Sequence, residues 1–162
     1  MPMQVQRLTA EHVDAVLEFE TVNRSWFAAA VPDRGDAFFA SYPARHAALL
    51  ALQDAGTDIF HVVVSADGTI AGRVNLIEID DGSAEIGYRV GAAFAGRGVA
   101  TWAVREVCEL ARSSYRLRSL RAVVSADNPG SRAVLVRNGF APAGETVVDG
   151  RLAHRFTRGL RL

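Results

Sequence analysis

The chain has 162 residues, of which 49% are apolar and 22% charged, a composition typical of one globular domain with a sizeable core. No apolar run approaches the ~18–20 residues that cross a membrane, and the N-terminus lacks the basic-then-apolar pattern of a secretion signal. Cys108 is the only cysteine, and its place on the apolar side of a predicted helix favours a buried thiol. We therefore expect one domain over residues 1–162 in a reducing, cytoplasmic setting.

The net charge of zero conceals an uneven distribution. Residues 1–96 carry 6 Arg against 13 Asp and Glu, a net charge of −7, and residues 97–162 carry 12 Arg against 5 acidic residues, a net charge of +7. Two solvated faces would explain this, and so would a basic half that binds a phosphorylated cofactor beside an acidic half that binds a cationic amine. Nucleic-acid binding is not favoured, because basic and aromatic residues do not cluster and the pI is near 6.9.

The first third of the chain predicts a strand and two helices. Residues 3–8 alternate weakly, as an edge strand does, and Thr9 is a candidate cap for a helix that ends near residue 21. A second helix, over residues 44–55, ends at Gly56. Residues 23–43 are less regular, and their five aromatic residues either line a substrate pocket or pack as core beneath a loop: Trp26, Phe27, Phe38, Phe39 and Tyr42.

The rest of the chain alternates strands with two more helices. Residues 59–65, 70–79 and 84–90 read as three antiparallel strands, joined by Asp-Gly turns. A long amphipathic helix that begins near Gly98, a strand, a helix after Asn128 and a final hairpin around Asp149-Gly150 complete the order. This order predicts an α/β fold with a mixed, mostly antiparallel sheet of about seven strands and about four helices.

The turn Ala95-Gly96-Arg97-Gly98-Val99-Ala100 carries the first functional signal. Its small residues let successive backbone N–H groups point into one concavity, and the following helix adds its free N-terminal donors and the positive end of its dipole. Such a site binds a phosphate or pyrophosphate. A P-loop would need Lys and then Ser or Thr where Val99 and Ala100 stand, and a dinucleotide-binding fingerprint would need Gly or Ala where Thr101 stands. The turn therefore fits neither of these two phosphate-binding motifs well.

This turn resembles the coenzyme A loop of the GNAT superfamily of N-acetyltransferases, whose pattern is Gln/Arg-x-x-Gly-x-Gly/Ala. Gly98 and Ala100 match the last two fixed positions, whereas Ala95 stands where Gln or Arg is usual. The departure puts one side-chain contact at issue and leaves the backbone cradle intact.

A second stretch, Ser125 to Phe140, is similar to the family's other signature, Asn-x-x-Ser/Ala followed by an apolar helix and Gly-Phe. Asn128 is a candidate N-cap with Pro129 at the first helical position, and Gly139 is a left-handed stop. The resemblance covers roughly residues 59–159 and is greatest to the branch that acetylates ribosomal proteins.

The resemblance implies a splayed sheet, acetyl-CoA or coenzyme A as cofactor, and an amine acceptor. Pantetheine would pair with the strand backbone, the pyrophosphate would lie on the turn, and Asn128 would touch the cofactor's arm. The protein would act as a monomer or homodimer, without membrane or nucleic acid, and the four scattered histidines predict no metal site. The expected coenzyme-binding residues are Tyr88, Arg89, Val90, Gly96, Arg97, Gly98, Val99, Ala100, Thr101, Asn128 and Ser131.

Glu85 is the candidate catalytic base. It is the only acid between Gly82 and Arg105 and lies in a predicted central strand, where burial would raise the pKa of its carboxyl toward the range of a base. The alternative, given equal weight, is a Glu85 that pairs with Arg73 or Arg89 across the sheet or is solvated beyond the splay.

Ser131 is the candidate acid for the leaving thiolate. Many family members carry a Tyr seven residues after the Asn, and here that position is Leu135. Ser131 is the next candidate acid, as in the branch that acetylates ribosomal proteins. The alternative is that its hydroxyl bonds only its own helix or the cofactor. The leading hypothesis is acetyl transfer from acetyl-CoA to a primary amine, on a protein, a peptide or a small molecule. The alternative is a non-catalytic acyl-CoA-binding module, which Leu135 favours and Glu85 argues against.

Overall fold

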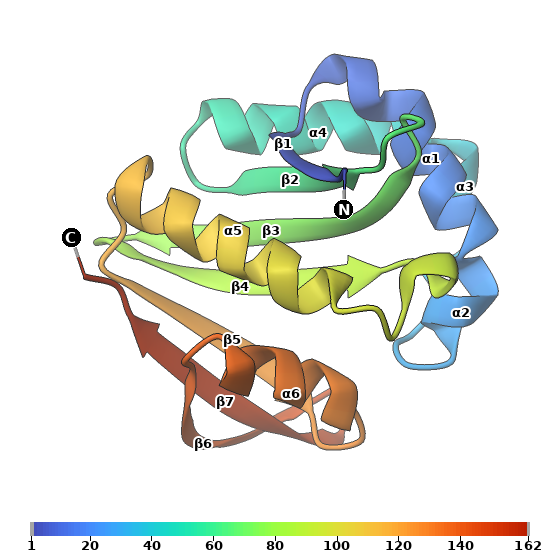
Figure 1. The fold of residues 1–162 in the computed structure, drawn as a ribbon. Coiled ribbons are helices and arrows are strands. Elements are labelled where there is room, and N and C mark those ends of the chain that lie inside the picture. Colours follow the sequence, from blue (N-terminus) through green and yellow to red (C-terminus); the bar gives the residue numbers. More distant parts are fainter. Residues whose placement is uncertain (1, 162) are drawn as a thin grey trace.

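The computed structural model describes residues 2–161, which form one seven-stranded sheet in the order β1-β2-β3-β4-β5-β7-β6 (Figure 1). Every neighbouring pair is antiparallel except β4 and β5. The predicted mixed, mostly antiparallel sheet is therefore confirmed, with residues 3–8 supplying an edge strand as expected. The strands are β1 (Gln4–Arg7), β2 (Ile59–Val64), β3 (Ile70–Asp80), β4 (Ser83–Val90), β5 (Ser119–Ser125), β6 (Ala141–Val148) and β7 (Arg151–Gly159).

Six α-helices accompany the sheet within residues 2–161, against the four or so predicted. The difference lies in residues 23–43, which contain two helices of 5 residues each. Helices that short hold too few turns for a 3.6-residue apolar repeat to appear in the sequence. The helices are α1 (Val13–Val22), α2 (Arg24–Ala28), α3 (Asp36–Ala40), α4 (Tyr42–Asp54), α5 (Val99–Ser113) and α6 (Pro129–Arg137), with the 3-10 turns η1 (Ala10–His12) and η2 (Ala92–Phe94).

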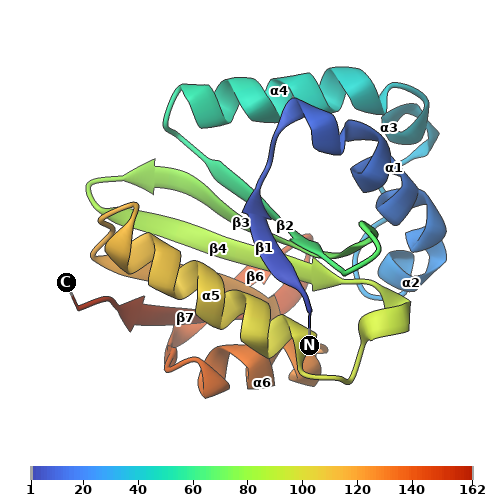
Figure 2. The ribbon, with the colours of Figure 1, turned by 45° about the horizontal axis from the view of Figure 1, so that its top comes forward.

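Helices cover both faces of the sheet (Figure 2). Phe60 and Val62 of β2 pack into one core with residues of α1 and α4, while Ile59 and Val63 pack into a second, larger core with α5 and α6. Successive strand side chains point to opposite faces, so a strand covered on both sides reads as one continuous apolar run. Cys108 of α5 is 2% exposed, which confirms the predicted buried thiol.

Two Asp-Gly turns fix the hairpins that the sequence predicted. Asp149 and Gly150 have φ angles of 51° and 74°, the two positive values that a type I′ turn needs between β6 and β7. Asp81 and Gly82, at 48° and 76°, join β3 to β4 in the same way. These turns set the registers of the strands on either side of the sheet's centre.

β4 and β5 separate after a short paired segment, as the resemblance implied (Figure 1). Their register extends only from Ser83–Ser119 to Glu85–Arg121, although β4 continues to Val90. Beyond Glu85, β4 pairs with β3 alone, so its other edge presents backbone groups to the gap. No helix of residues 2–161 is long and apolar enough to cross a membrane.

Candidate active site

A groove of about 720 Å³ opens where β4 and β5 separate. β4 and the turn before α5 form one wall, the first turns of α6 form another, and α2 with the residues after it covers a third side. Arg97 is exposed and does not line the groove. All the other predicted coenzyme-binding residues do: Tyr88, Arg89, Val90, Gly96, Gly98, Val99, Ala100, Thr101, Asn128 and Ser131.

The turn before α5 is an open cradle for an anion. Gly96 and Gly98 have φ angles of 72° and 77°, in the left-handed region that favours glycine, and no atom lies within 4 Å of a Cβ built at either. Helix α5 starts directly after Gly98 without a side-chain cap, so the N–H groups of its first turn lack intrahelical partners. Open space, free donors and the helix dipole suit the pyrophosphate of coenzyme A.

The start of α6 forms the opposite wall. The Asn128 Oδ1 accepts a hydrogen bond from the Ser131 N–H at 3.0 Å, and Pro129 is the first helical residue, which confirms the predicted cap. Gly139, with φ of 80°, ends the helix as expected. At that end the Asn138 amide donates to the Thr101 carbonyl of α5 at 3.2 Å. Asn138, which the sequence did not single out, thus ties the C-terminal end of α6 to the first turn of α5.

Tyr88 sends its hydroxyl from β4 to α6. That hydroxyl donates to the Ser131 carbonyl at 2.8 Å and accepts from the Ser131 Oγ at 2.9 Å. Burial raises the pKa of Tyr88 to about 12, against the opposing effect of the Ser131 hydrogen bond, so the phenol stays protonated at neutral pH. Leu135 is fully buried in the core. Tyr88 was expected to act only through its backbone. In the structure its hydroxyl contacts Ser131, one helical turn before Leu135, the position where the family's usual tyrosine would stand.

The aromatic residues of 23–43 divide between the two interpretations. Trp26 and Phe27 line the groove, and the Trp26 indole N–H donates to the Val90 carbonyl at 3.1 Å, a backbone atom of the β4 segment assigned to pantetheine. Tyr42 is fully buried and Phe38 packs against its ring, with centroids 5.4 Å apart. The sequence gives no local signal that separates the two groups.

Glu85 does not line the groove. It lines a second cavity of about 350 Å³, together with Arg121 and residues of β5, β6 and β7. Burial raises the pKa of the Glu85 carboxyl and the nearby Glu78 adds to this, while Arg121 opposes it. Side chains alternate along a strand, so Glu85 and Arg89 share one face of β4 and Tyr88 is on the other. At Gly87, between them, no atom lies within 4 Å of a built Cβ.

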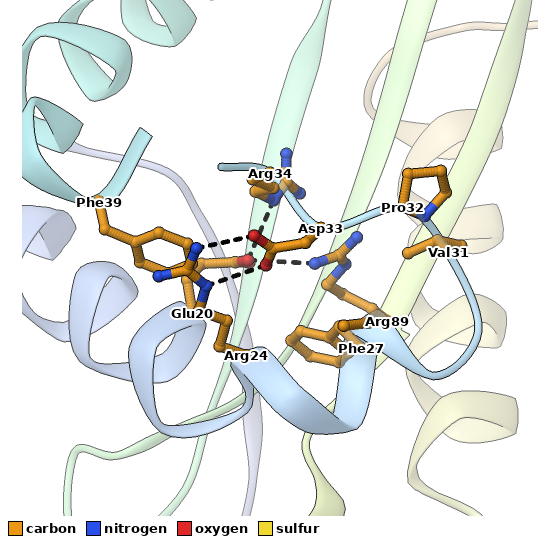
Figure 3. A pocket seen from close by; sticks show the side chains of 10 residues that line it. Glu20, Arg24, Phe27, Val31, Pro32, Asp33, Arg34, Phe39 and Arg89 are labelled. Atoms are coloured by element: carbon orange, nitrogen blue, oxygen red, sulfur yellow. Dashed lines mark hydrogen bonds and ion pairs between the residues drawn. The ribbon is translucent and has the colours of Figure 1, made fainter. Parts of the chain in front are cut away.

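Arg73 and Arg89, the partners considered for Glu85, bind Glu20 instead. Glu20 of α1 is only 1% exposed. Its Oε1 accepts hydrogen bonds from Arg34 Nε at 3.1 Å and from Arg89 Nη1 at 3.0 Å. Its Oε2 accepts a hydrogen bond from Arg73 Nη1 at 3.0 Å. Figure 3 shows Glu20, Arg34 and Arg89 converging beside Phe27. These partners are 14, 69 and 53 residues from Glu20 in sequence, which explains why no local pattern revealed the cluster.

Two of the four histidines have structural roles. His46 is buried against the Tyr42 hydroxyl and the Thr9 carbonyl, and His61 is buried between the Val74 carbonyl and the Tyr115 hydroxyl. Burial lowers the pKa of His61 to about 4. In the described part of the chain, no three His, Cys, Asp or Glu side chains gather where a metal ion would bind.

The splayed sheet, the glycine-rich turn and the capped α6 are the three structural features that the resemblance to the GNAT superfamily implied. The chain matches the model of the acetyltransferase (GNAT) domain over residues 3–141, and it therefore belongs to that family. This match extends the resemblance, noted from about residue 59 onward, through the N-terminal helices.

Individual relatives agree with this assignment. The putative ribosomal N-acetyltransferase YdaF of Bacillus subtilis (strain 168) is 33% identical over 81 residues, 49% of this chain and 44% of that protein. The chain thus spans about half the length of the curated relatives it matches. Ribosomal-protein-S5-alanine acetyltransferase from Vibrio fischeri shares the fold at a TM-score of 0.91 and 21% identity, covering 98% of this chain and 93% of that one. Mycobacterium smegmatis RimJ in complex with CoA-disulfide follows at 0.87 and 23%, covering 97% and 81%.

Proposed function

We propose that the protein is an N-acetyltransferase that moves an acetyl group from acetyl-CoA to a primary amine by direct attack. The observation that carries this proposal is the groove itself, which combines an open glycine cradle, a free β4 edge and a hydroxyl pair within one cavity. The coenzyme carried by the Mycobacterium smegmatis relative supports the choice of cofactor.

The chain's backbone would hold most of the cofactor. The turn from Gly96 to Thr101 would bind the pyrophosphate, the β4 edge at Tyr88–Val90 would pair with pantetheine, and Asn128 would contact the same arm from α6. When bound, the cofactor supplies a thioester, an acyl carbon activated for attack by an amine. The Trp26 indole would leave the Val90 carbonyl to make that group available for pairing.

Glu85 would accept the amine's proton, directly or through a water molecule. Its raised pKa makes it a stronger base than an exposed carboxylate. Its side chain lies on the face of β4 opposite Tyr88, so the amine would approach from that face. An N-terminal amine, with a pKa near ~8, demands less of such a base than a lysine near ~10.4.

Tyr88 and Ser131 would stabilise the departing sulfur. Because the pKa of Tyr88 is about 12 and that of a thiol is near ~8.5, Tyr88 would keep its proton. To donate that proton to the sulfur, the hydroxyl would have to turn away from the Ser131 carbonyl. Ser131, the predicted acid, is held beside it by their mutual hydrogen bond at 2.9 Å. The pair would replace the hydroxyl that the family's usual tyrosine supplies and that Leu135 lacks.

The second candidate is a non-catalytic acyl-CoA-binding module. The position of Glu85 outside the groove and the burial of Leu135 favour it, whereas the Tyr88–Ser131 pair argues for transfer. A protein acceptor is favoured by the Vibrio fischeri relative, an acetyltransferase of ribosomal protein S5.

The reducing, cytoplasmic setting and the monomeric or dimeric state stay predictions.

The test is release of free thiol from acetyl-CoA in the presence of N-terminal peptides and small amines, with the acetylated product identified by mass spectrometry. An N-acetyltransferase gives thiol and acetylated amine in equal amounts, at a rate that depends on the acceptor. Tight binding of acetyl-CoA without any acetylated amine across the panel would select the binding module instead.

A further inference from the structure

The buried cluster around Glu20 contains more positive than negative charge. One carboxylate faces three guanidinium groups, those of Arg34, Arg73 and Arg89. The Arg73 side chain is 6% exposed, and within residues 2–161 its Nε finds no hydrogen-bond acceptor. Burial lowers the pKa of Arg89 to about 10, with Glu20 opposing that change and the neighbouring arginines adding to it. Arg34 is exposed, but the buried Arg73 and the half-buried Arg89 still outnumber the one Glu20 carboxylate, and such an excess favours a further anion.

Neighbouring charges correct this imbalance only in part. Arg24 pairs with Asp33 at 2.7 Å (Figure 3) and with Asp36 at 2.8 Å, so a single arginine faces these two carboxylates. Asp36 is also 97% exposed, which screens it from the buried group. Counted together, the two groups hold four arginines against three carboxylates, so one positive charge stays in excess.

The cluster adjoins the groove through shared walls. Phe27, Val31 and Arg89 line both the groove and a narrow cavity of about 10 Å³ that reaches Glu20 and Arg34. A cavity of that size holds about one water molecule. An anionic group would therefore lie at its mouth, on the groove side, in contact with Arg89, which is 23% exposed. Arg34 and Arg73 would act on it through their charge.

The face of β4 gives the direction of the acceptor. Glu85, Gly87 and Arg89 alternate onto the face opposite the Tyr88 side chain, and the space over Gly87 is open. Four strand residues span about 13 Å between Cα atoms. An acceptor whose amine approaches Glu85 could thus place a second group, one or two peptide residues away, at Arg89.

We propose that the acceptor is a primary amine that carries an anionic group, a carboxylate or a phosphate, and that Arg89 with Arg34 and Arg73 selects it. This inference rests on the proposed function and names its substrate class. The same charges disfavour polyamines, because a second ammonium group would face the buried arginines.

Matched acceptors test the proposal. A peptide with Asp at its second position is compared with the Asn version, the same peptide with phosphoserine there is compared with the Ser version, and both pairs are compared with spermidine. The anionic member of at least one pair should be acetylated with a kcat/KM roughly tenfold or more higher, and added salt should reduce that ratio. The Asp pair and the phosphoserine pair separate a carboxylate from a phosphate as the selected group.

Arg34→Gln removes one charge from the cluster and leaves the buried Arg73 and Arg89 on Glu20. It should lower the anionic preference several-fold, whereas Arg112→Gln, a matched loss of charge at the far end of α5, should not. If Arg34→Gln instead weakens coenzyme A binding and leaves acceptor preference intact, the anion is the coenzyme's phosphate and the proposal is wrong.

Calorimetry of each acceptor with the coenzyme A complex gives the same preference without turnover. Charge-selective binding with no acetyl transfer would overturn the proposed function and leave only an anion-selective amine site. Acetyl transfer with equal binding and kcat/KM for anionic and neutral acceptors would overturn this inference alone.

Discussion

The two sides of β4 are built by different means. On the side of α5 and α6, the groove is shaped by backbone: positive φ angles at Gly96 and Gly98, the uncapped start of α5 and the Asn128 cap. On the side of α1–α3, it is shaped by long side chains that meet over Glu20. A backbone cradle suits a cofactor that many proteins share, whereas side chains suit an acceptor particular to this protein.

The strongest test of the acceptor side is Glu85→Gln. This change keeps the shape of the residue and removes the proton acceptor, so kcat should fall by roughly 10²–10⁴, the usual value of general base catalysis. Wild-type rates should decline as pH falls through the raised pKa of Glu85, because the protonated carboxyl cannot accept a proton. The Glu85→Gln variant should not show this decline on the acid side of the profile. A pH–rate profile on one N-terminal peptide checks this. Identical profiles would assign Glu85 a structural role, with coenzyme A affinity as the control that should not change.

The matching test of the coenzyme side is Gly98→Val. A branched side chain at φ of 77° is strained and would project into the space where we place the pyrophosphate. Coenzyme A affinity should fall by roughly 100-fold, equivalent to ~2.7 kcal/mol. Ala95→Gln, in the same turn, restores the residue usual in the family and should leave affinity unchanged or improved. Calorimetry on the folded variants decides, and an unaltered affinity for Gly98→Val would remove the cradle assignment.

Tyr88→Phe tests the boundary between the two sides. Loss of a hydrogen bond to a charged sulfur should lower kcat by roughly 10–100-fold with little change in coenzyme A affinity. The thiol of bound coenzyme A supplies a readout that needs no acceptor: its pKa, followed by thiolate absorbance, should be lower in the wild type than in Tyr88→Phe. Equal thiol pKa values in both proteins would leave Tyr88 a structural link to α6.

Asn128→Ala should give the smallest effect of the four variants, and it should change both the stability of the protein and the binding of acetyl-CoA. Loss of the Ser131 N–H bond should lower the free energy of unfolding by about 1 kcal/mol. Because Asn128 also lines the groove, the apparent KM for acetyl-CoA should rise. Asp127→Ala, at the exposed neighbouring position, is the control for denaturation and kinetics. A change in stability alone would make Asn128 a helix cap and nothing more.

Local signals account for what the sequence predicted well. Gly98 and Ala100 at fixed spacing, Asn128 before Pro129, and the Asp-Gly turns each act within a few residues, so one sequence suffices to recognise them. The open splay and the cradle follow from those features and from the family resemblance.

Tertiary contacts account for what the sequence did not reveal. The Tyr88 hydroxyl meets Ser131 across 43 residues, the Trp26 indole meets Val90 across 64, and Glu20 meets Arg89 across 69. Helices α2 and α3 are 5 residues each and gain their order from packing rather than from an apolar repeat. Glu85 was predicted from its isolation in the sequence, which could not reveal that it opens into a separate cavity.

A crystal structure of the protein with coenzyme A tests the central claim most directly. We predict that the pyrophosphate lies on the backbone of residues 96–101, that pantetheine runs along the free edge of β4, and that the Trp26 indole no longer donates to the Val90 carbonyl. The coenzyme sulfur should lie within hydrogen-bond reach of the Tyr88 hydroxyl. Coenzyme A bound elsewhere, or a groove in which the bond between Trp26 and Val90 persists beside the ligand, would contradict the account.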